Sequence, residues 1–195
     1  MPAQEPIRPA NIRPPSGESF YIQQFLDSTR RTQKYIRRAA RRAQMRPADR
    51  RLSALDAPWR HRNVQSALKQ AERNIQIAVV LLDNAIDDGD PQAVFTSDNV
   101  AWLKEETNNF IQPVRDCIAA IDPAFIAQKP NDQPAWVLIA FRWLLDMQSG
   151  AKKMEENEKR LITKAKGLAE TFDVHAQRIE SIIDNMYRQR FDPIQ

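Results

Sequence analysis

The sequence has few of the residues that metal binding or covalent cross-linking requires. Cys117 is its only cysteine, and His61 and His175 are its only histidines. A single cysteine excludes an intramolecular disulfide and a disulfide-stapled secreted scaffold, so we expect a reducing, intracellular compartment. Without a Glu-x-x-His pair the di-iron bundle pattern is also excluded, and we expect no bound metal. His175 falls on the apolar seam of the last predicted helix, where a core position is expected.

Long apolar runs are missing as well. The most apolar stretch, residues 136–147, is shorter than the roughly 20 residues that cross a bilayer, so no transmembrane helix is predicted. A helix that is apolar on all sides is usually buried, and we expect this one at the centre of a bundle. The alternative is a membrane-active helical protein that inserts this segment after a conformational change, with Trp136 and Trp143 as interfacial anchors.

Glycine is scarce, with four residues in 195, and no stretch alternates apolar and polar residues as a strand would. The sequence therefore predicts an all-α fold. Residues 1–18 are rich in proline and have no apolar core, which predicts a disordered arm and no signal peptide. Residues 19–195 are expected to form one domain, an elongated bundle of about four helices. Their predicted ranges are 19–46, 59–87, 98–121 and 134–190.

Apolar spacing and prolines place these helices. Pro47 ends the first helix, and a loop around 56–58 precedes the second. The second helix has a regular apolar seam that includes Val64, Leu68 and Ile75. Additional apolar residues at Ile77, Val80 and Leu81 widen it and predict that this half is central in the bundle. Pro113 is expected to kink the third helix.

The last predicted helix is too long for a compact bundle. At about 1.5 Å per residue it would reach on the order of 80 Å, so it either bends near Gly150 or projects as a coiled-coil arm. Apolar residues follow a heptad spacing along it. On this basis Ile179, Ile182 and Met186 are candidate contacts for a partner helix, and the alternative function is a helical adaptor that pairs through them or forms a homo-oligomer.

The most informative segment is residues 28–62, in which twelve Lys and Arg residues meet only Asp49 and Asp56. On a helical projection the basic residues of the first helix lie opposite Phe25, Ile36 and Ala43. Arginine's planar fork matches phosphate and carboxylate oxygens, and neutralising phosphates releases counterions. The predicted polyanion contacts are Arg30, Arg31, Lys34, Arg37, Arg38, Arg41, Arg42, Arg46, Arg50 and Arg51.

The competing interpretation is that these arginines pair with acidic residues in the rest of the chain or stay solvated opposite the core face. Residues 63–195 hold fifteen Lys and Arg against twenty Asp and Glu, and Glu155, Glu156 and Glu158 are candidate partners. Tyr35 and Trp59 flank the basic segment and are read first as packing residues. No zinc finger, RNA-recognition signature or helix-turn-helix accompanies the charge, so sequence-specific readout is not predicted. We expect a non-enzymatic structural or scaffolding protein that binds a polyanion through its Arg-rich helix. The expected polyanion is mainly nucleic acid, and another acidic polymer or an acidic protein surface is the alternative partner.

The enzymatic alternative is an all-α nucleotide pyrophosphohydrolase. Glu155 with Glu158, and Glu170 with Asp173, have the spacing of carboxylate pairs that bind Mg²⁺. Both pairs lie in one predicted helix, so they converge only if the chain folds back at Gly167. No phosphate-binding loop or covalent nucleophile is recognisable. We therefore expect no enzyme and no cofactor.

Overall fold

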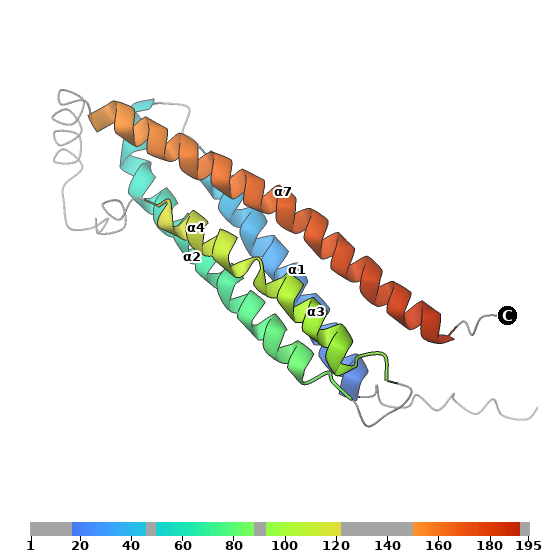
Figure 1. Ribbon diagram of the computed structural model, residues 1–195. Helices are drawn as coiled ribbons and strands as arrows, with labels where there is room; N and C mark the ends of the chain where they lie inside the picture. Colours follow the sequence, from blue (N-terminus) through green and yellow to red (C-terminus); the bar gives the residue numbers. More distant parts are fainter. Residues whose placement is uncertain (1–16, 46–49, 88–92, 122–149, 192–195) are drawn as a thin grey trace, which may run out of the picture.

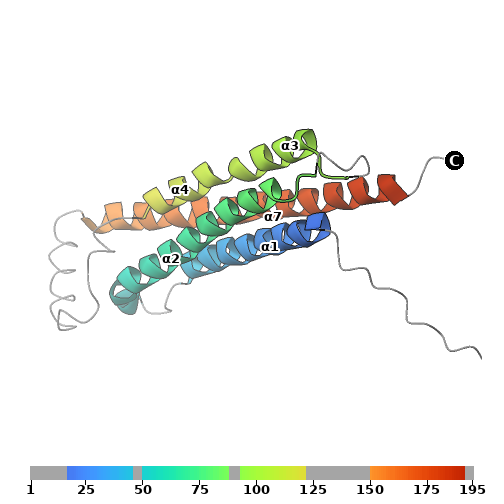
Figure 2. The same ribbon diagram turned by 90° about the horizontal axis from the view of Figure 1, so that it is seen from below.

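The computed structural model describes residues 17–45, 50–87, 93–121 and 150–191. The helices within these ranges are α1 (Gly17–Gln44), α2 (Arg50–Asp83), α3 (Ser97–Asn108), α4 (Ile111–Ala119) and α7 (Gly150–Phe191). They run along one long axis, and no strand occurs within the described ranges (Figures 1 and 2). The elongated all-α bundle is confirmed. The predicted arm lies outside the described residues up to residue 16, and helix α1 already begins at Gly17.

Helices α1 and α2 form an antiparallel hairpin. The Ser28 hydroxyl donates to the Asn74 carbonyl over 3.0 Å, and Arg60 Nη1 donates to the Met45 carbonyl at the end of α1 over 2.8 Å. Helix α7 packs along α1, while α3 and α4 lie along α2 and α4 also contacts α7 (Figure 1). The basic helix α1 is thus held between α2 and α7.

Two predicted helix boundaries were wrong. Helix α2 begins at Arg50 and not near residue 59, because the backbone stays helical through Pro58 into the buried Arg60 and Val64. Packing after the proline overrides its low helix propensity. The third predicted helix is two helices, separated at Asn109–Phe110. Pro113 has no N–H for the Asn109 carbonyl, so the expected kink is a complete break.

Helix α7 is continuous from Gly150 to Phe191. Its 42 residues measure about 63 Å at 1.5 Å per residue. It passes through Gly167 without interruption, and a Cβ placed there would meet no atom within 4 Å. Residues 134–149, including the apolar segment expected at the centre of the bundle, lie outside the described residues.

Among the described residues the core consists of two clusters along the bundle axis. The first includes Ile36, Val64, Leu68, Val114, Leu161 and Phe172. The second includes Ile22, Phe25, Leu82, Phe95, Leu103 and Ile183. The apolar face predicted for α1 is confirmed. The second half of α2 is enclosed only in part, because Leu81 packs against the second cluster whereas Ile77 and Val80 are exposed.

The predicted partner-helix contacts also need correction. Ile179 is 1% exposed and belongs to the second core cluster, and Met186 packs against the same cluster. Ile182 is half-buried. The heptad spacing of α7 therefore reflects its packing on the chain's own helices, with Ile183 buried in place of Ile182.

Candidate polyanion interface

The predicted basic face of α1 is at the surface. Its exposed members are Arg30, Arg31, Lys34, Arg37, Arg38 and Arg41, and Arg42 is half-buried. Phe25, Ile36 and Ala43, predicted to lie on the opposite side, are buried. The separation of charge from apolar residues around α1 is therefore confirmed, and it leaves the cations at the solvent boundary.

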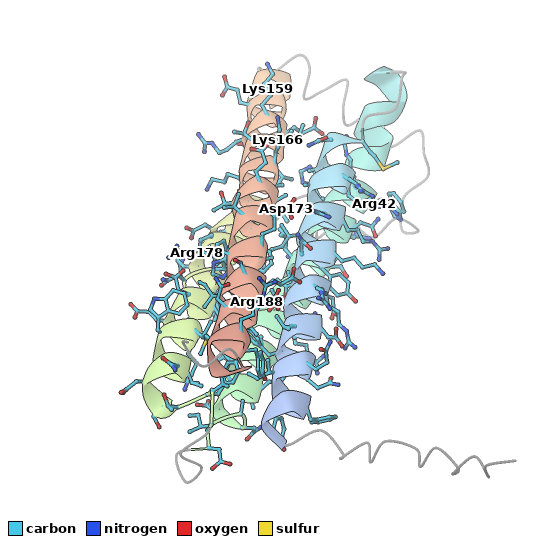
Figure 3. The ribbon with its side chains drawn as sticks, turned by 90° about the vertical axis from the view of Figure 1, so that its right-hand side faces the viewer. Arg42, Lys159, Lys166, Asp173, Arg178 and Arg188 are labelled. Atoms are coloured by element: carbon cyan, nitrogen blue, oxygen red, sulfur yellow. The ribbon has the colours of Figure 1, made fainter. Side chains whose placement is uncertain are left out.

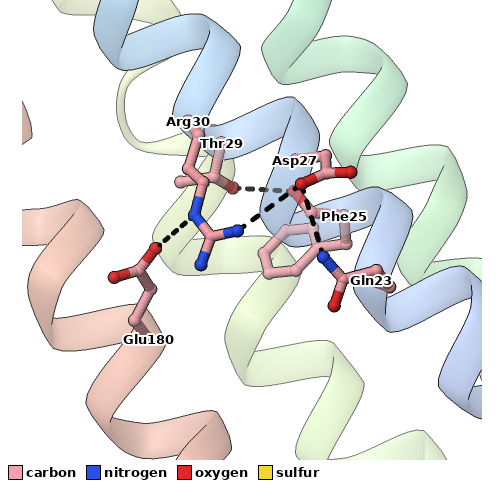
Figure 4. Close-up of polar contacts among 6 residues, drawn as sticks. All are labelled: Gln23, Phe25, Asp27, Thr29, Arg30 and Glu180. Carbon is pink, nitrogen blue, oxygen red and sulfur yellow. Dashed lines mark hydrogen bonds and ion pairs between the residues drawn. The ribbon is translucent and has the colours of Figure 1, made fainter.

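Two of these arginines pair with α7. Arg30 Nε lies 2.9 Å from Glu180 Oε1, and its Nη1 lies 3.5 Å from Asp27 Oδ1 (Figure 4). Arg37 Nε donates to both carboxylate oxygens of Asp173, at 2.9 and 3.0 Å. Because the arginines and the acids are each seven residues apart and in opposite order, the pairs fix an antiparallel register between α1 and α7. Exposed pairs of this kind contribute about 0–1 kcal/mol each.

The interpretation that these arginines pair within the chain thus holds for one edge of α1. Their acidic partners, however, are not the residues that the sequence predicted. Glu158 binds the buried Arg60, and Glu156 is exposed. The side chain of Glu155 lies outside the described residues. The acids of α7 neutralise Arg30 and Arg37 and leave the remaining cations of the helix uncovered.

The remaining exposed cations form what we call the basic stripe: Arg31, Lys34, Arg38 and Arg41. Successive members are three, four and three residues apart, which places them on one side of an α-helix over about 15 Å. Within the part of the chain that the structure describes, none of the four side chains has a hydrogen bond or ion pair. The stripe is a row of like charges on a rigid support.

Such a row does not help the helix to fold. Like charges three or four residues apart destabilise a helix by about 0.2–0.5 kcal/mol per pair, and the stripe contains Arg31 beside Lys34, Lys34 beside Arg38, and Arg38 beside Arg41. Only Arg41, in the last turn of α1, gains from the helix dipole. The fold therefore offers no stabilising role for the middle of the stripe.

Arg42 and Trp59 lie together beside the C-terminal end of the stripe. The Arg42 guanidinium carbon is 5.3 Å from the centre of the Trp59 ring, a cation–π contact between α1 and α2. Trp59 is 49% exposed, so only about half of its surface takes part in packing. Tyr35 does pack against the first core cluster, as predicted. The exposed indole is a feature that sequence reasoning undervalued.

Other members of the basic segment are placed differently. Arg60 is 2% exposed, and its Nη2 lies 2.6 Å from Glu158 Oε1, so it is part of the core and not of the surface. Arg46 lies outside the described residues. Arg50 and Arg51 are in the first turn of α2, but their side chains are not among those described.

The structure offers little support for other chemistry. In residues 17–45, 50–87, 93–121 and 150–191 no group of three or more His, Cys, Asp or Glu residues is arranged to hold a metal. The fold-back required by the pyrophosphohydrolase alternative is absent, and Glu158 and Glu170 are about 18 Å apart along α7. Glu158 and Asp173 instead bind Arg60 and Arg37.

A small cavity of about 10 Å³ lies beside the Arg60–Glu158 pair, lined also by Ala43, His61 and Leu161. Arg60 Nε is buried there without a hydrogen-bond partner among the described residues. A space of this size holds about one water molecule. It is too small for a substrate, so the surface stripe is the better candidate site.

Comparison with known proteins assigns no function to the chain. None of the described helices combines the length and apolar character needed to cross a membrane. No protein family, curated protein or solved structure matches the chain. The case for a function therefore rests on the residues of the bundle.

Proposed function

We propose that this protein is a non-enzymatic structural or scaffolding protein that binds a polyanion, nucleic acid in particular, along the basic stripe of α1. The observation that carries the proposal is the alignment of Arg31, Lys34, Arg38 and Arg41 on one exposed face without partners among the described residues. A linear polyanion presents negative charges at regular intervals and can neutralise all four at once.

The charge distribution around the stripe supports this orientation. Acidic residues of α7 pair with Arg30 and Arg37 on one edge of α1, so among the described residues the four stripe cations remain without an acidic partner. Counterions condensed on the polymer are released as the cations replace them, which drives binding at low salt. Contacts of this kind read the backbone and not the bases, so we expect no strong sequence preference.

The adaptor alternative is not favoured by a comparable observation. Its proposed contacts Ile179 and Met186 are used in the second core cluster, and presenting them to a partner would require α7 to separate from the bundle. The basic stripe needs no such rearrangement.

The proposal is tested with a pair of matched variants. Lys34→Gln/Arg38→Gln removes two stripe charges four residues apart, and Arg160→Gln/Lys164→Gln removes the same two charges, equally exposed and equally spaced, from α7. Binding of labelled oligonucleotides, followed by fluorescence anisotropy at low salt, is expected to weaken at least about tenfold in the first variant and little in the second. Equal loss in both would mean that net charge alone attracts the polymer, and no binding by the unmodified protein would refute the proposal.

A further inference from the structure

The exposed indole of Trp59 extends the basic stripe with a group of different chemistry. Trp59 contacts Arg42, which directly follows the stripe residue Arg41 and lies one helical turn after Arg38. The ring therefore lies beside the C-terminal end of the stripe, and half of its surface faces solvent. An aromatic face next to a line of phosphate-binding cations is the combination found in proteins that bind single strands.

One contact to the ring and one anchor at the next residue in the chain restrict the position of this ring. Arg42 holds it from α1, and the next residue in the chain, Arg60, is anchored in the core by Glu158 and the Met45 carbonyl. Little conformational entropy remains to be lost when a ligand stacks on a ring already held in this way. The exposed part of the Trp59 ring is thus a preorganised surface on which a base can stack.

We infer that the polyanion is a single-stranded nucleic acid, whose phosphates follow the stripe while one base stacks on Trp59. The inference rests on the proposed function and specifies its ligand. A duplex keeps its bases paired and stacked, so reaching one costs a few kcal/mol of unpairing. Inorganic polyphosphate has no base. Neither the duplex nor polyphosphate therefore gains free energy from stacking on Trp59.

The chain contains a control for this inference. Trp102 in α3 makes the same type of contact with Arg178 of α7, at 5.8 Å, and is 37% exposed. Figure 3 shows Arg178 on the side of α7 away from α1, whereas Arg42 lies on the α1 side. Exposed acids, Asp98 and Glu105, are on the same helix as Trp102. This second indole lacks the neighbouring stripe.

The experiment compares Trp59→Ala, Trp59→Phe and Trp102→Ala with the unmodified full chain. Each is titrated with labelled oligothymidylate and oligouridylate, a DNA duplex and inorganic polyphosphate, and circular dichroism and thermal melting verify the fold. Trp59→Ala is expected to weaken binding of either single strand at least about fivefold, with duplex and polyphosphate binding changed less than twofold. Trp59→Phe keeps an aromatic face and should retain most of the affinity, and Trp102→Ala should bind normally.

Tryptophan fluorescence supplies a second readout that does not depend on the alanine variant. Single strands should quench the fluorescence of the unmodified protein, and Trp59→Phe should abolish that quenching. If single strands bind Trp59→Ala and the unmodified protein equally while Lys34→Gln/Arg38→Gln loses binding, the stacking inference is overturned and the polyanion proposal stands. If no polymer binds the unmodified protein, both fail. The two single-stranded arms distinguish DNA from RNA.

Discussion

Arg37 Nε lies within 3.0 Å of both carboxylate oxygens of Asp173, joining the C-terminal half of α1 to the middle of α7. Arg30 and Glu180 repeat the contact seven residues away on each helix. These pairs divide the cations of α1 into an edge that α7 neutralises and a stripe that it does not. The proposed function concerns the stripe alone, and the pairs set its boundary.

Removing stripe charges should not harm the fold. Lys34→Gln/Arg38→Gln relieves repulsion within α1, and we expect the free energy of unfolding to rise by a few tenths of a kcal/mol or stay unchanged. Urea denaturation followed by circular dichroism measures this. A loss above about 1 kcal/mol would show that these side chains support the fold, which would undermine their assignment as binding residues.

The buried Arg60–Glu158 pair should behave in the opposite way. Its side chains are 3% and 18% exposed, so Arg60→Met leaves the Glu158 carboxylate without its buried partner. We expect a loss of about 3 kcal/mol or more in the free energy of unfolding. The control is Glu180→Gln at the exposed Arg30 pair, which should cost less than about 1 kcal/mol. Similar losses in the two variants would contradict the distinction between the pairs.

His175 should make the stability depend on pH. Burial lowers its pKa below the ordinary 6.5, Glu106 opposes this and Arg178 adds to it. Its ring packs on Phe110, with centroids 4.2 Å apart, and on Phe172. Because the unfolded chain takes up the proton more readily, the contribution is complete above about pH 6.5 and is lost as pH falls below that value. His175→Gln should reduce the difference in melting temperature between pH 7 and pH 5. An unchanged difference would mean that groups other than His175 cause the pH dependence.

Cys117 should be chemically inert in the folded protein. The thiol is 1% exposed, and burial raises its pKa to about 11, partly opposed by Lys164. Since the thiolate is the reactive form, a thiol reagent at pH 8 should react only as fast as the chain unfolds. Modification should become rapid in denaturant. Fast modification of the native chain would mean that α4 opens readily.

Gly167 should be replaceable with a gain in stability. It lies in the middle of α7, and the position of an added Cβ has no neighbour within 4 Å. Gly167→Ala is therefore expected to raise the free energy of unfolding by about 0.5–1 kcal/mol, because alanine loses less backbone entropy in a helix. A destabilised variant would indicate that α7 bends at this residue.

The sequence predicted those parts of the fold that depend on apolar spacing. The buried face of α1 and the seam residues Val64, Leu68 and Ile75 of α2 were predicted correctly because helical periodicity reports burial directly. The helix boundaries predicted wrongly are those near Pro58 and Pro113. At these prolines tertiary packing decides between a kink, a break and a continuous helix. Spacing also could not reveal that Ile183, and not Ile182, is the buried residue of that pair.

For the candidate site, the sequence predicted the cations but not their individual surroundings. Which arginines pair depends on the register of α1 against α7, and only that register separates Arg30 and Arg37 from the stripe. The run of basic residues also included Arg60, whose burial depends on Glu158, distant in the chain. Trp59 was undervalued because the start of a helix gives no signal of exposure, although its proximity to arginines was visible.

The most direct test of the account is the salt dependence of oligonucleotide binding by the unmodified protein and by Lys34→Gln/Arg38→Gln. For a single strand, each phosphate contact contributes about 0.7 to the slope of log K against log salt, so four stripe contacts predict a slope near −3. The variant should bind more weakly with a slope shallower by about 1.4. A variant whose slope equals that of the unmodified protein would contradict the claim that the stripe residues contact the phosphates.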